Sequence, residues 1–436
     1  MGFKVVIVGG GLSGLGLAHC LAKAGIDFIV LERSDLLVPK GGASMALWPN
    51  NVRLLDQLGL LKGAEEIDCG IKYKQNVRRD GSVLQKSNMM ERVGVALGHP
   101  WMCFHRPKLH EYLFNTLPEH DSRIITNVEV TGIETTPDGV KVTCKDGTVH
   151  EGSIVVGSDG VNSSVRKHIA KGDEKHADPF STSYRALYGC SSWTKGLDPQ
   201  TLYEMHGDKT SIQVIPGPGI AMFVVYERLP TTTKGSKRYT EDEKSEFAKT
   251  AQDLSVSEDI KFKDIWSETT WSYFSGLEEG VAPNWFGDRA VLIGDTVHKM
   301  TPNVGLGLNS GWQSAAVLTN GLHQLLSKNP DPSTEELNQV FKDYQEVRMK
   351  NASDMNGISG LYTRVVAWDN PLWKLADQYI TPLIGGDCAL LDLLLVPLVA
   401  KQGNVLSFAD ENHYKSGKTP WKTGQTVVLK DVKVAA

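Results

Sequence analysis

Three glycines near the beginning of the chain constrain its fold more than any other feature. Gly9, Gly11 and Gly14 form the pattern Gly-x-Gly-x-x-Gly. A continuous apolar run, 3–8, comes directly before them, and the segment 12–24 that follows has the composition of a helix. A second apolar run then begins. This order predicts a strand, a helix and a second, parallel strand, which is the repeating unit of sheets covered by helices.

The spacing of these glycines fits a turn that binds a pyrophosphate. The first glycine permits the tight turn, the second lets the backbone approach the phosphates, and the third lets the helix pack closely on the strand. The positive end of the helix dipole favours the anion. Glu32, followed by Arg33, ends the second apolar run 28–31, where a carboxylate can accept hydrogen bonds from a ribose diol. The segment therefore predicts a dinucleotide site.

A second turn of Gly and Asp follows another predicted strand. The short apolar run 154–156 leads into Gly157-Ser158-Asp159-Gly160, and a helical pattern with Arg166 comes next. An Asp-Gly turn before a helix is common, so this motif also fits a plain helix cap followed by a solvated arginine. Both interpretations of Asp159 stay open from the sequence.

A third turn repeats the arrangement later in the chain. The apolar run 290–293 ends in a Gly-Asp pair at Asp295. Gly305 and Gly307 then come before a long helical pattern that starts near Leu308. Backbone N–H groups at such a helix start can face a negatively charged group.

The middle of the chain has a different pattern. From about 182 to 229 several short β segments alternate with turns, at 184–190, 202–205, 212–215 and 221–226. This composition predicts an antiparallel sheet that forms a second lobe. After Leu308 helical patterns dominate, and the polar tail after Asn412 is expected to be poorly ordered.

In their order and separation the three turn motifs resemble the FAD-dependent aromatic hydroxylases, the group A flavoprotein monooxygenases. The resemblance extends from Phe3 to about Met349. The segment 42–50 with Ala46 resembles the loop beside the isoalloxazine, and Arg106 stands in an Arg-x-x-Leu segment whose Arg lies near FAD in that family. One departure is Ser314, where the family often has an acidic residue. The sequence looks most like the fungal secondary-metabolism branch.

The resemblance implies an α/β fold with a Rossmann-like FAD-binding domain, an antiparallel β-sheet substrate domain and a helical C-terminal region. The FAD-binding domain is expected from 1–71, 102–175 and 285–355, the substrate domain from 72–101 and 176–284, and the C-terminal helical region and tail from 356–436.

The resemblance also implies which residues contact FAD. Asp295 is expected to hold a ribityl hydroxyl, and backbone N–H groups near Gly305 and Gly307 are expected to face the flavin pyrimidine. The full predicted set is Gly9, Gly11, Gly14, Glu32, Arg33, Ala46, Arg106, Asp159, Asp295, Gly305, Gly307 and Leu308.

The chemistry implied by the family is oxygen transfer. NADPH or NADH reduces FAD, and O2 adds to form a 4a-hydroperoxide that epoxidises or hydroxylates an electron-rich aromatic, indole or olefinic small molecule in secondary-metabolite biosynthesis. No second nucleotide fingerprint is present, which leaves the choice between NADH and NADPH open. The alternatives are a flavin-dependent halogenase, a dehydrogenase, or a non-catalytic flavoprotein that sequesters an intermediate. The pattern Trp-x-Trp-x-Ile-Pro, expected of a halogenase, is absent from the sequence.

Arg185 is the predicted catalytic residue. It is a polar break in an apolar strand, 184–190, of the predicted substrate lobe. We expect it to reach the pocket and position the substrate or the oxygen that is transferred. Because successive side chains of a strand point to opposite faces, a solvated edge arginine is the alternative.

Composition and charge exclude several partners. The chain has 46 basic and 51 acidic residues, a net charge of −5 without a long basic run, so no nucleic-acid partner is expected. The six cysteines include no Cys-x-x-Cys pair, which predicts reduced thiols, a cytoplasmic location and no metal site. His298 lacks a companion at metal-ligand spacing and is expected to be structural.

No transmembrane segment is expected. The most apolar late stretch, 390–400, carries Asp392 and Pro397 and is too short to span a bilayer. A buried helix is the preferred interpretation and peripheral membrane contact the alternative. The expected partners are a small-molecule substrate and O2, for a monomer or a homodimer.

Overall fold

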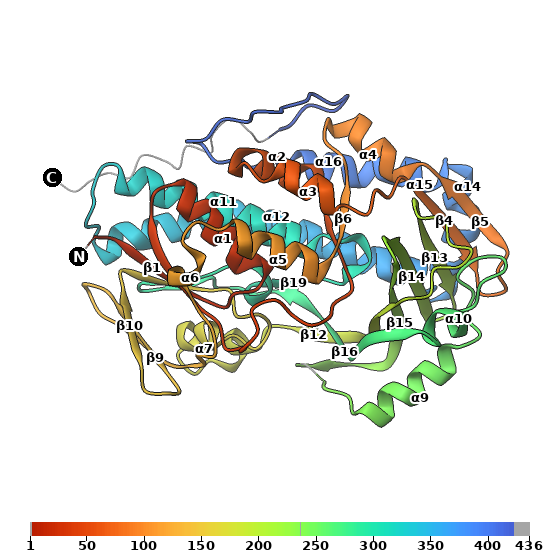
Figure 1. Cartoon of the computed structure of the whole chain (residues 1–436), viewed down its shortest axis with the longest axis horizontal. Coiled ribbons are helices and arrows are strands. Elements are labelled where there is room, and N and C mark those ends of the chain that lie inside the picture. The colour runs from red at the N-terminus through yellow and green to blue at the C-terminus, as the bar shows by residue number, and fades with distance from the viewer. Residues whose placement is uncertain (1, 236, 423–436) are drawn as a thin grey trace.

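The computed structural model describes residues 2–235 and 237–422 (Figure 1). Its first part is built on a six-stranded sheet in the order β17-β18-β11-β1-β2-β7. The neighbours are parallel except for the edge pair β17–β18. The strands are β1 (Lys4–Val8), β2 (Asp27–Leu31), β7 (Ile124–Ile125), β11 (Ile154–Gly157), β17 (Phe286–Gly287) and β18 (Ala290–Leu292).

Helices and a small sheet cover this parallel sheet. Helices α1, α5 and α11 pack together on one side in Figure 1, and a three-stranded sheet β10-β9-β8 with α7 packs on the other. The central strands are fully buried, as a parallel sheet covered on both faces requires. The bounds are α1 (Leu12–Lys23), α5 (Arg106–Thr116), α11 (Gly307–Leu326), α7 (Ser164–Ala170), β8 (Val130–Thr135), β9 (Val140–Cys144) and β10 (Val149–Gly152).

The second part is an eight-stranded sheet in the order β19-β16-β12-β15-β14-β13-β4-β5. All neighbours are antiparallel except β13 and β4, which run parallel because the chain leaves the sheet after β5 and passes through the first part of the molecule before it returns. The bounds are β4 (Tyr73–Arg78), β5 (Val83–Ser87), β12 (Ser181–Ser191), β13 (Thr201–Gly207), β14 (Thr210–Gly217), β15 (Ile220–Lys234), β16 (Thr269–Val281) and β19 (His298–Lys299).

The two faces of this sheet have different neighbours. One face carries Leu187 and Phe223, which pack with Phe247 of α9 (Glu241–Ala251) and with α10 (Phe262–Trp266). The other carries Tyr184, Ala186 and Tyr226 and packs against Ala43, in the loop before β3 (Ser44–Leu47). Only this second face therefore looks toward the first part of the molecule. Segments 72–101 and 176–284 supply strands of this one sheet, and we propose them together as the substrate domain.

Short elements connect the two parts. Strand β3 pairs with β6 (Met102–His105) in a two-stranded sheet. The remaining elements before α12 are α2 (Pro49–Leu58), α3 (Leu61–Ile67), α4 (Met89–Leu97), α6 (His120–Arg123), α8 (Glu174–Ala177), η1 (Gly294–Thr296) and η2 (Pro302–Val304).

The C-terminal region is helical, as predicted. Its predicted start at 356 falls inside the long helix α12 (Thr334–Val366), and the chain then continues as short helical turns. These are α13 (Pro371–Leu375), η3 (Ala376–Ile380), α14 (Thr381–Leu383), α15 (Gly386–Leu390), η4 (Leu391–Leu395) and α16 (Val396–Ala400). In the described part of the chain no single helix is long and apolar enough to cross a membrane. The segments 371–383 and 386–400, bent by 91° at their junction, meet that criterion only as a pair.

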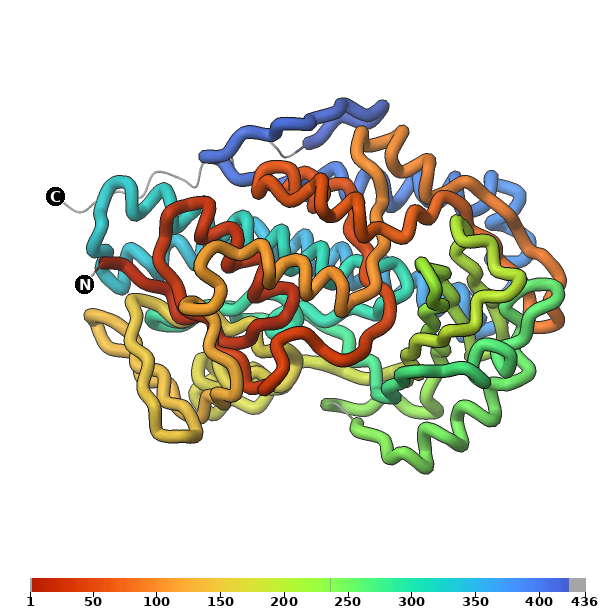
Figure 2. The backbone as a smooth tube through the Cα atoms, in the orientation of Figure 1, coloured from red at the N-terminus to blue at the C-terminus, as the bar shows by residue number. Residues whose placement is uncertain are grey.

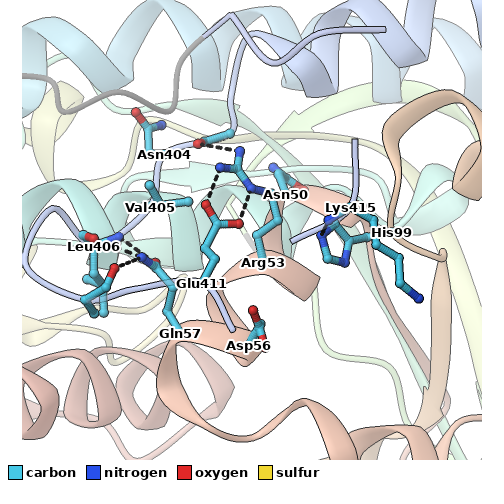
Figure 3. A network of polar contacts seen from close by, with 12 residues as sticks. Asn50, Arg53, Asp56, Gln57, His99, Asn404, Val405, Leu406, Glu411 and Lys415 are labelled. Carbon is cyan, nitrogen blue, oxygen red and sulfur yellow. Dashed lines mark hydrogen bonds and ion pairs between the residues drawn. The ribbon is translucent and has the colours of Figure 1, made fainter. Parts of the chain in front are cut away.

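The last described segment, 402–422, lies along α2 (Figure 2). Arg53 of α2 binds the Glu411 carboxylate with two nitrogens, at 2.8 and 2.6 Å, and Gln57 bonds to the backbone of Leu406 (Figure 3). His413 bonds to Asp56 through its backbone and its ring. The prediction of a poorly ordered tail after 412 is therefore wrong up to 422, and residues 423–436 lie outside the described residues.

Candidate active site

The fingerprint turn has the contacts that its glycines imply. Gly9 has a backbone φ of +104°, and a Cβ at this position would stand 2.6 Å from the carbonyl oxygen of Ser158. A Cβ at Gly14 would stand 2.1 Å from the carbonyl oxygen of Gly9. At Gly11, by contrast, no heavy atom of the described chain comes within 4 Å of an added Cβ. Gly9 and Gly14 are thus required because a side chain there would clash with the backbone of the protein, whereas Gly11 borders open space.

That open space lies at the start of α1. Among the described residues no side chain caps this helix end, and its first turn carries no acidic residue. The N-terminal N–H groups of a helix favour an anion, and a pyrophosphate is the anion that FAD brings. The residues present therefore fit the group that the sequence pattern predicts.

Glu32 stands at the carboxyl end of β2, beside this turn. Its carboxylate accepts hydrogen bonds from the backbone N–H of Gly10 at 2.7 Å and of Ser34 at 2.8 Å. A carboxylate has further acceptor sites after two such bonds, so it can also receive a ribose hydroxyl. Arg33 is exposed beside it.

Asp159 accepts hydrogen bonds at the start of the helix that follows it, whose N-cap residue is Ser163. Its carboxylate accepts hydrogen bonds from the Ser163 hydroxyl at 2.5 Å and from the Ser164 N–H at 2.7 Å. Arg166 is buried and donates to the carbonyl of Thr296 at 2.8 Å and to that of Ala177 at 3.0 Å. The alternative of a solvated arginine is therefore wrong, because Arg166 joins the second turn motif to the third. A contact of Asp159 with FAD stays a prediction.

Asp295 and Lys299 form an ion pair at the third motif, with 2.5 Å between Oδ2 and Nζ. Burial alone would raise the pKa of Asp295, but the Lys299 ammonium and then His298 and Arg106 hold it below its ordinary value. Asp295 is nevertheless 40 % exposed and lies at the start of α11, where a Cβ on Gly307 would stand 4.0 Å from its Oδ1. An accessible, ionised carboxylate at this place suits a sugar-like hydroxyl.

The loop with Ala46 is fixed to the same helix start. The Asn309 amide donates to the carbonyls of Ala46 at 2.8 Å and Gly305 at 2.6 Å, and its oxygen accepts from the Trp48 N–H at 2.8 Å. A Cβ on Gly305 would stand 2.8 Å from the Cβ of Ala46. Leu308 is buried just beyond. The structure thus brings these predicted residues together, and Asn309 is a positioning residue that the predicted set lacked.

Arg106 is exposed at the start of α5, near the same groups. Its charge lowers the pKa of Asp295, and after burial it is the second cause that lowers the pKa of His110 to about 4. The His110 ring bonds to the carbonyl of Gly10 at 3.0 Å, so α5 also holds the fingerprint turn. A neutral imidazole and a nearby guanidinium at this place agree with an anionic ligand.

Arg185 does not reach this site. Its guanidinium binds Glu227, with 2.6 Å from Nε to Oε2, and lies 5.1 Å from the ring centre of Phe247 and 5.5 Å from that of Phe274. These rings belong to the face of the sheet that α9 covers. The prediction that Arg185 projects toward the flavin is therefore wrong in its direction. Its alternative, a solvated edge arginine, also fails because the side chain is partly buried against aromatic rings.

Tyr188 takes the position expected for Arg185. It packs on the face that carries Tyr184 and Ala186, and burial followed by the nearby charges of Glu278 and Asp295 raises its pKa. Glu278 of β16 is buried to 6 % exposure and also contributes to the raised pKa of Lys299. Sequence reasoning missed both groups, although the period of two through 184, 186 and 188 was available as a signal.

His298 is structural. It is fully buried, its Nε2 lies 3.3 Å from the Ser310 hydroxyl and 3.4 Å from that of Ser314, and burial followed by the charge of Arg348 lowers its pKa to about 4. Ser314, where the resembling family often has an acid, lies 3.3 Å from Nε of the buried Arg348. Within the described residues no group of His, Cys, Asp and Glu is arranged to hold a metal ion.

Comparison with known proteins agrees with this geometry. The family model of an FAD binding domain matches residues 2–339. The FAD-dependent monooxygenase srdH of Neurospora crassa is 35% identical over 97% of this chain and 99% of its own length. The FAD-dependent monooxygenase ausM of Penicillium brasilianum is 31% identical over 88% of this chain and 83% of its own.

Solved structures share the fold. HpxO of Klebsiella pneumoniae, complexed with FAD and uric acid, matches with a TM-score of 0.72 and 18% identity over 90% of this chain and 97% of its own. The Diels-Alderase PyrE3 matches with a TM-score of 0.69 and 22% identity over 92% and 80%.

A Rossmann-like sheet with an uncapped pyrophosphate turn, joined to a β-sheet lobe, defines an FAD-binding enzyme, and the chain belongs to the FAD binding domain family. Within it the protein is an FAD-dependent monooxygenase of the fungal secondary-metabolite type.

Proposed function

We propose that the enzyme uses NADPH or NADH and O2 to epoxidise or hydroxylate an electron-rich aromatic, indole or olefinic small molecule. The nicotinamide supplies two electrons, one oxygen atom enters the product, and the other leaves as water. FAD, when bound, supplies the redox and oxygen chemistry, and the protein supplies position, polarity and exclusion of water. The names of the related monooxygenases support this reaction class.

The predicted FAD contacts form one continuous set in this proposal. The N-terminus of α1 at Gly11 would hold the pyrophosphate, Glu32 a ribose and Asp295 the ribityl chain. The loop at Ala46 and the start of α11 at Gly307 would lie beside the ring system. The fit rests on open backbone and accessible carboxylates at these places, and the individual contacts are proposals.

The proposal for the substrate rests on the face of the eight-stranded sheet that is turned toward these predicted FAD contacts. Around Tyr188 this face carries the apolar side chains of Ala186, Val224 and Leu277, and toward β13 it carries the polar Gln213 and Glu204. Tyr188 lies on the same face, and the charge of Glu278 contributes to its raised pKa. We infer a substrate with an apolar carbon skeleton whose polar end is oriented by this pair, since apolar contacts bind and a few polar groups orient.

A substrate panel tests the function. The purified enzyme is supplied with NADPH or NADH and with apolar aromatic, indole or olefinic compounds, and nicotinamide oxidation and products are measured. A substrate should accelerate nicotinamide oxidation and yield a product heavier by one oxygen atom. Oxidation that no apolar compound accelerates, together with turnover of a polar substrate, would contradict the substrate class.

Each alternative has its own distinguishing result. A halogenase would require chloride and release a halogenated product, and a dehydrogenase would release a product that has lost two hydrogens and gained no oxygen. A protein that sequesters an intermediate would bind it without consuming nicotinamide, and the fold of the Diels-Alderase PyrE3 shows that this scaffold is compatible with other chemistry.

A further inference from the structure

The helical turns between 371 and 395 expose an unusual number of large apolar side chains. Leu383 is 85 % exposed, Leu372 75 % and Leu393 66 %. The others are Leu375, Tyr379, Ile380, Ile384 and Leu394. We call these eight residues the outer apolar face. Figure 1 shows α14 and α15, which lie within this segment, at the same end of the molecule as β4 and β5.

Two of the three acidic residues of the same segment, Asp377 and Asp387, are buried instead. Asp377 accepts a hydrogen bond from the Trp368 indole N–H at 2.8 Å and lies 2.7 Å from Nδ1 of His206. Asp387 accepts from the Asn76 amide at 2.8 Å and pairs with Lys74 at 3.2 Å. A helix in water normally buries its leucines and exposes its aspartates. Here several leucines are exposed while two aspartates are buried, and the ion pairs of these aspartates hold the segment in that orientation.

Every charge of the segment 371–400 is matched by an opposite charge elsewhere in the protein. Its four charged residues form the pairs Lys374–Asp208, Asp377–His206, Asp387–Lys74 and Asp392–Arg92. Each charged residue beside the outer apolar face therefore has a partner of opposite charge. This charge pattern suits a surface without strong charge, and it gives a charged protein partner nothing to recognise.

We propose that the outer apolar face inserts into the interfacial layer of a lipid bilayer and anchors the enzyme to one leaflet. The two halves of the segment are bent by 91°, and the leucines of the outer apolar face are between 44 % and 85 % exposed. A fluid hydrocarbon surrounds such projecting side chains, whereas a protein interface requires a complementary, closely packed surface. This inference goes beyond the proposed function and does not depend on which substrate is used.

Flotation with lipid vesicles tests the anchor. The full-length, FAD-loaded enzyme is mixed with neutral phosphatidylcholine vesicles and centrifuged through a density gradient. The wild type should float with the vesicles, and added anionic lipid or salt should change the bound fraction little, because the charges are already paired. Each of the changes Leu372→Gln, Leu383→Gln and Leu393→Gln should weaken partitioning roughly tenfold. Leu383→Gln alone is informative, since a side chain with this exposure contributes little to folding.

A matched control uses exposed apolar residues outside the segment. Leu36 is 43 % exposed and Val149 52 %, and Leu36→Gln with Val149→Gln should leave flotation unchanged. FAD content and nicotinamide oxidation report that each variant is folded. The proposal is overturned if the wild type stays in the protein fraction. It is overturned as well if a variant that carries all three leucine changes floats as well as the wild type. It is also overturned if the triple variant only dissociates a dimer, because the face would then bind a second copy.

Discussion

Arg185 and Tyr188 lie three positions apart on β12 and project from opposite faces of the eight-stranded sheet. Arg185 lies over the ring of Phe247 on the α9 side, whereas Tyr188 lies near the charges of Asp295 and Glu278 on the side that faces the first part of the molecule. Two substitutions on one strand can therefore separate the two faces functionally.

We expect Tyr188→Phe to retain FAD and to lower the amount of product formed per nicotinamide oxidised by about twofold to tenfold, the value of one lost hydrogen bond. Arg185→Ala should leave this ratio near the wild-type value, since its partners are Glu227 and aromatic rings. Product and hydrogen peroxide are measured together. If Arg185→Ala lowered this ratio more than Tyr188→Phe, Arg185 rather than Tyr188 would belong to the active site.

The glycine fingerprint gives a second pair of variants. Gly11→Ala should leave the stability of the FAD-free protein unchanged, because its Cβ meets no described heavy atom within 4 Å, yet it should weaken FAD binding by filling the space of the pyrophosphate. Gly14→Ala should destabilise the FAD-free protein itself, because its Cβ would stand 2.1 Å from a carbonyl oxygen.

Thermal unfolding without FAD and titration with FAD separate these two effects. Gly357→Ala is the control. Its Cβ meets open space in the exposed part of α12, and it should stabilise the helix by about 0.5–1 kcal/mol without changing FAD affinity. If Gly11→Ala binds FAD as tightly as the wild type, the pyrophosphate lies elsewhere.

Asp295→Asn should weaken FAD binding by roughly 1.5–3 kcal/mol, the typical value of a hydrogen bond to a charged group. The variant also leaves Lys299 without the carboxylate that lies 2.5 Å from its ammonium. Asp288→Asn is matched to it, because Asp288 pairs with Lys171 at 3.1 Å on the surface, and it should not change FAD affinity. Equal FAD dissociation constants for the two variants would contradict the assignment of Asp295.

His206 should make the stability depend on alkaline pH. Burial lowers its pKa, but the carboxylate of Asp377 and then Glu204 raise it to about 9 from an ordinary value of 6.5. Since the folded state binds the proton more tightly, the stabilisation is fully present below pH 6.5 and is lost as the pH rises through about 9. The pKa of Glu204 is lowered to about 2, so its own contribution is lost only in strong acid.

The variant His206→Gln tests this relation. It leaves the buried carboxylate of Asp377 without its ion-pair partner, while Glu204 keeps Lys74 at 2.7 Å, and should cost about 3–5 kcal/mol at pH 6. It should also remove most of the decline that the wild type shows on going from pH 6.5 to 9.5, measured by chemical denaturation. Lys145→Ala, which removes an exposed pair with Glu129, should cost at most about 1 kcal/mol and keep that decline. The same decline in the His206 variant would exclude this histidine as its source.

Some of this organisation is visible in the sequence because it is local. The turn at Gly9 and Gly14 depends on a close approach between residues a few positions apart, and Glu32 follows from its place at a strand end. The faces of β12 were harder to predict, since the alternation from Tyr184 onward separates the two faces but does not say which one packs against α9 and which one against the first part of the molecule.

The remaining site residues come from contacts between distant segments. Glu278 lies near Lys299 because β16 pairs with β19. The composition of these two strands does not predict that pairing. Arg53 and Glu411 are 358 positions apart, so the order of the tail could not follow from its polar composition. Such contacts are decided by the packing of the whole chain rather than by local preference.

The contact between α2 and the tail leads to a prediction about the stability of the protein. Arg53 is 3 % exposed and its partner Glu411 15 %, so Glu411→Gln should leave a buried guanidinium poorly paired and lower the unfolding free energy by about 3 kcal/mol. Glu258→Gln removes an exposed carboxylate that lies 3.6 Å from Lys86 and should change it by less than about 1 kcal/mol. Chemical denaturation that shows equal losses would indicate that the tail adds nothing to the stability of α2.

The origin of the oxygen in the product tests most directly the claim that this protein is an FAD-dependent monooxygenase. The FAD-loaded enzyme is reduced without oxygen by a nicotinamide, mixed with an accepted substrate, and exposed to oxygen-18 gas in ordinary water, and the product is analysed by mass spectrometry. One heavy oxygen atom per product molecule, and none when the label is supplied as water, is the predicted result. Product without heavy oxygen, or formed equally well by FAD-free protein, would contradict the claim.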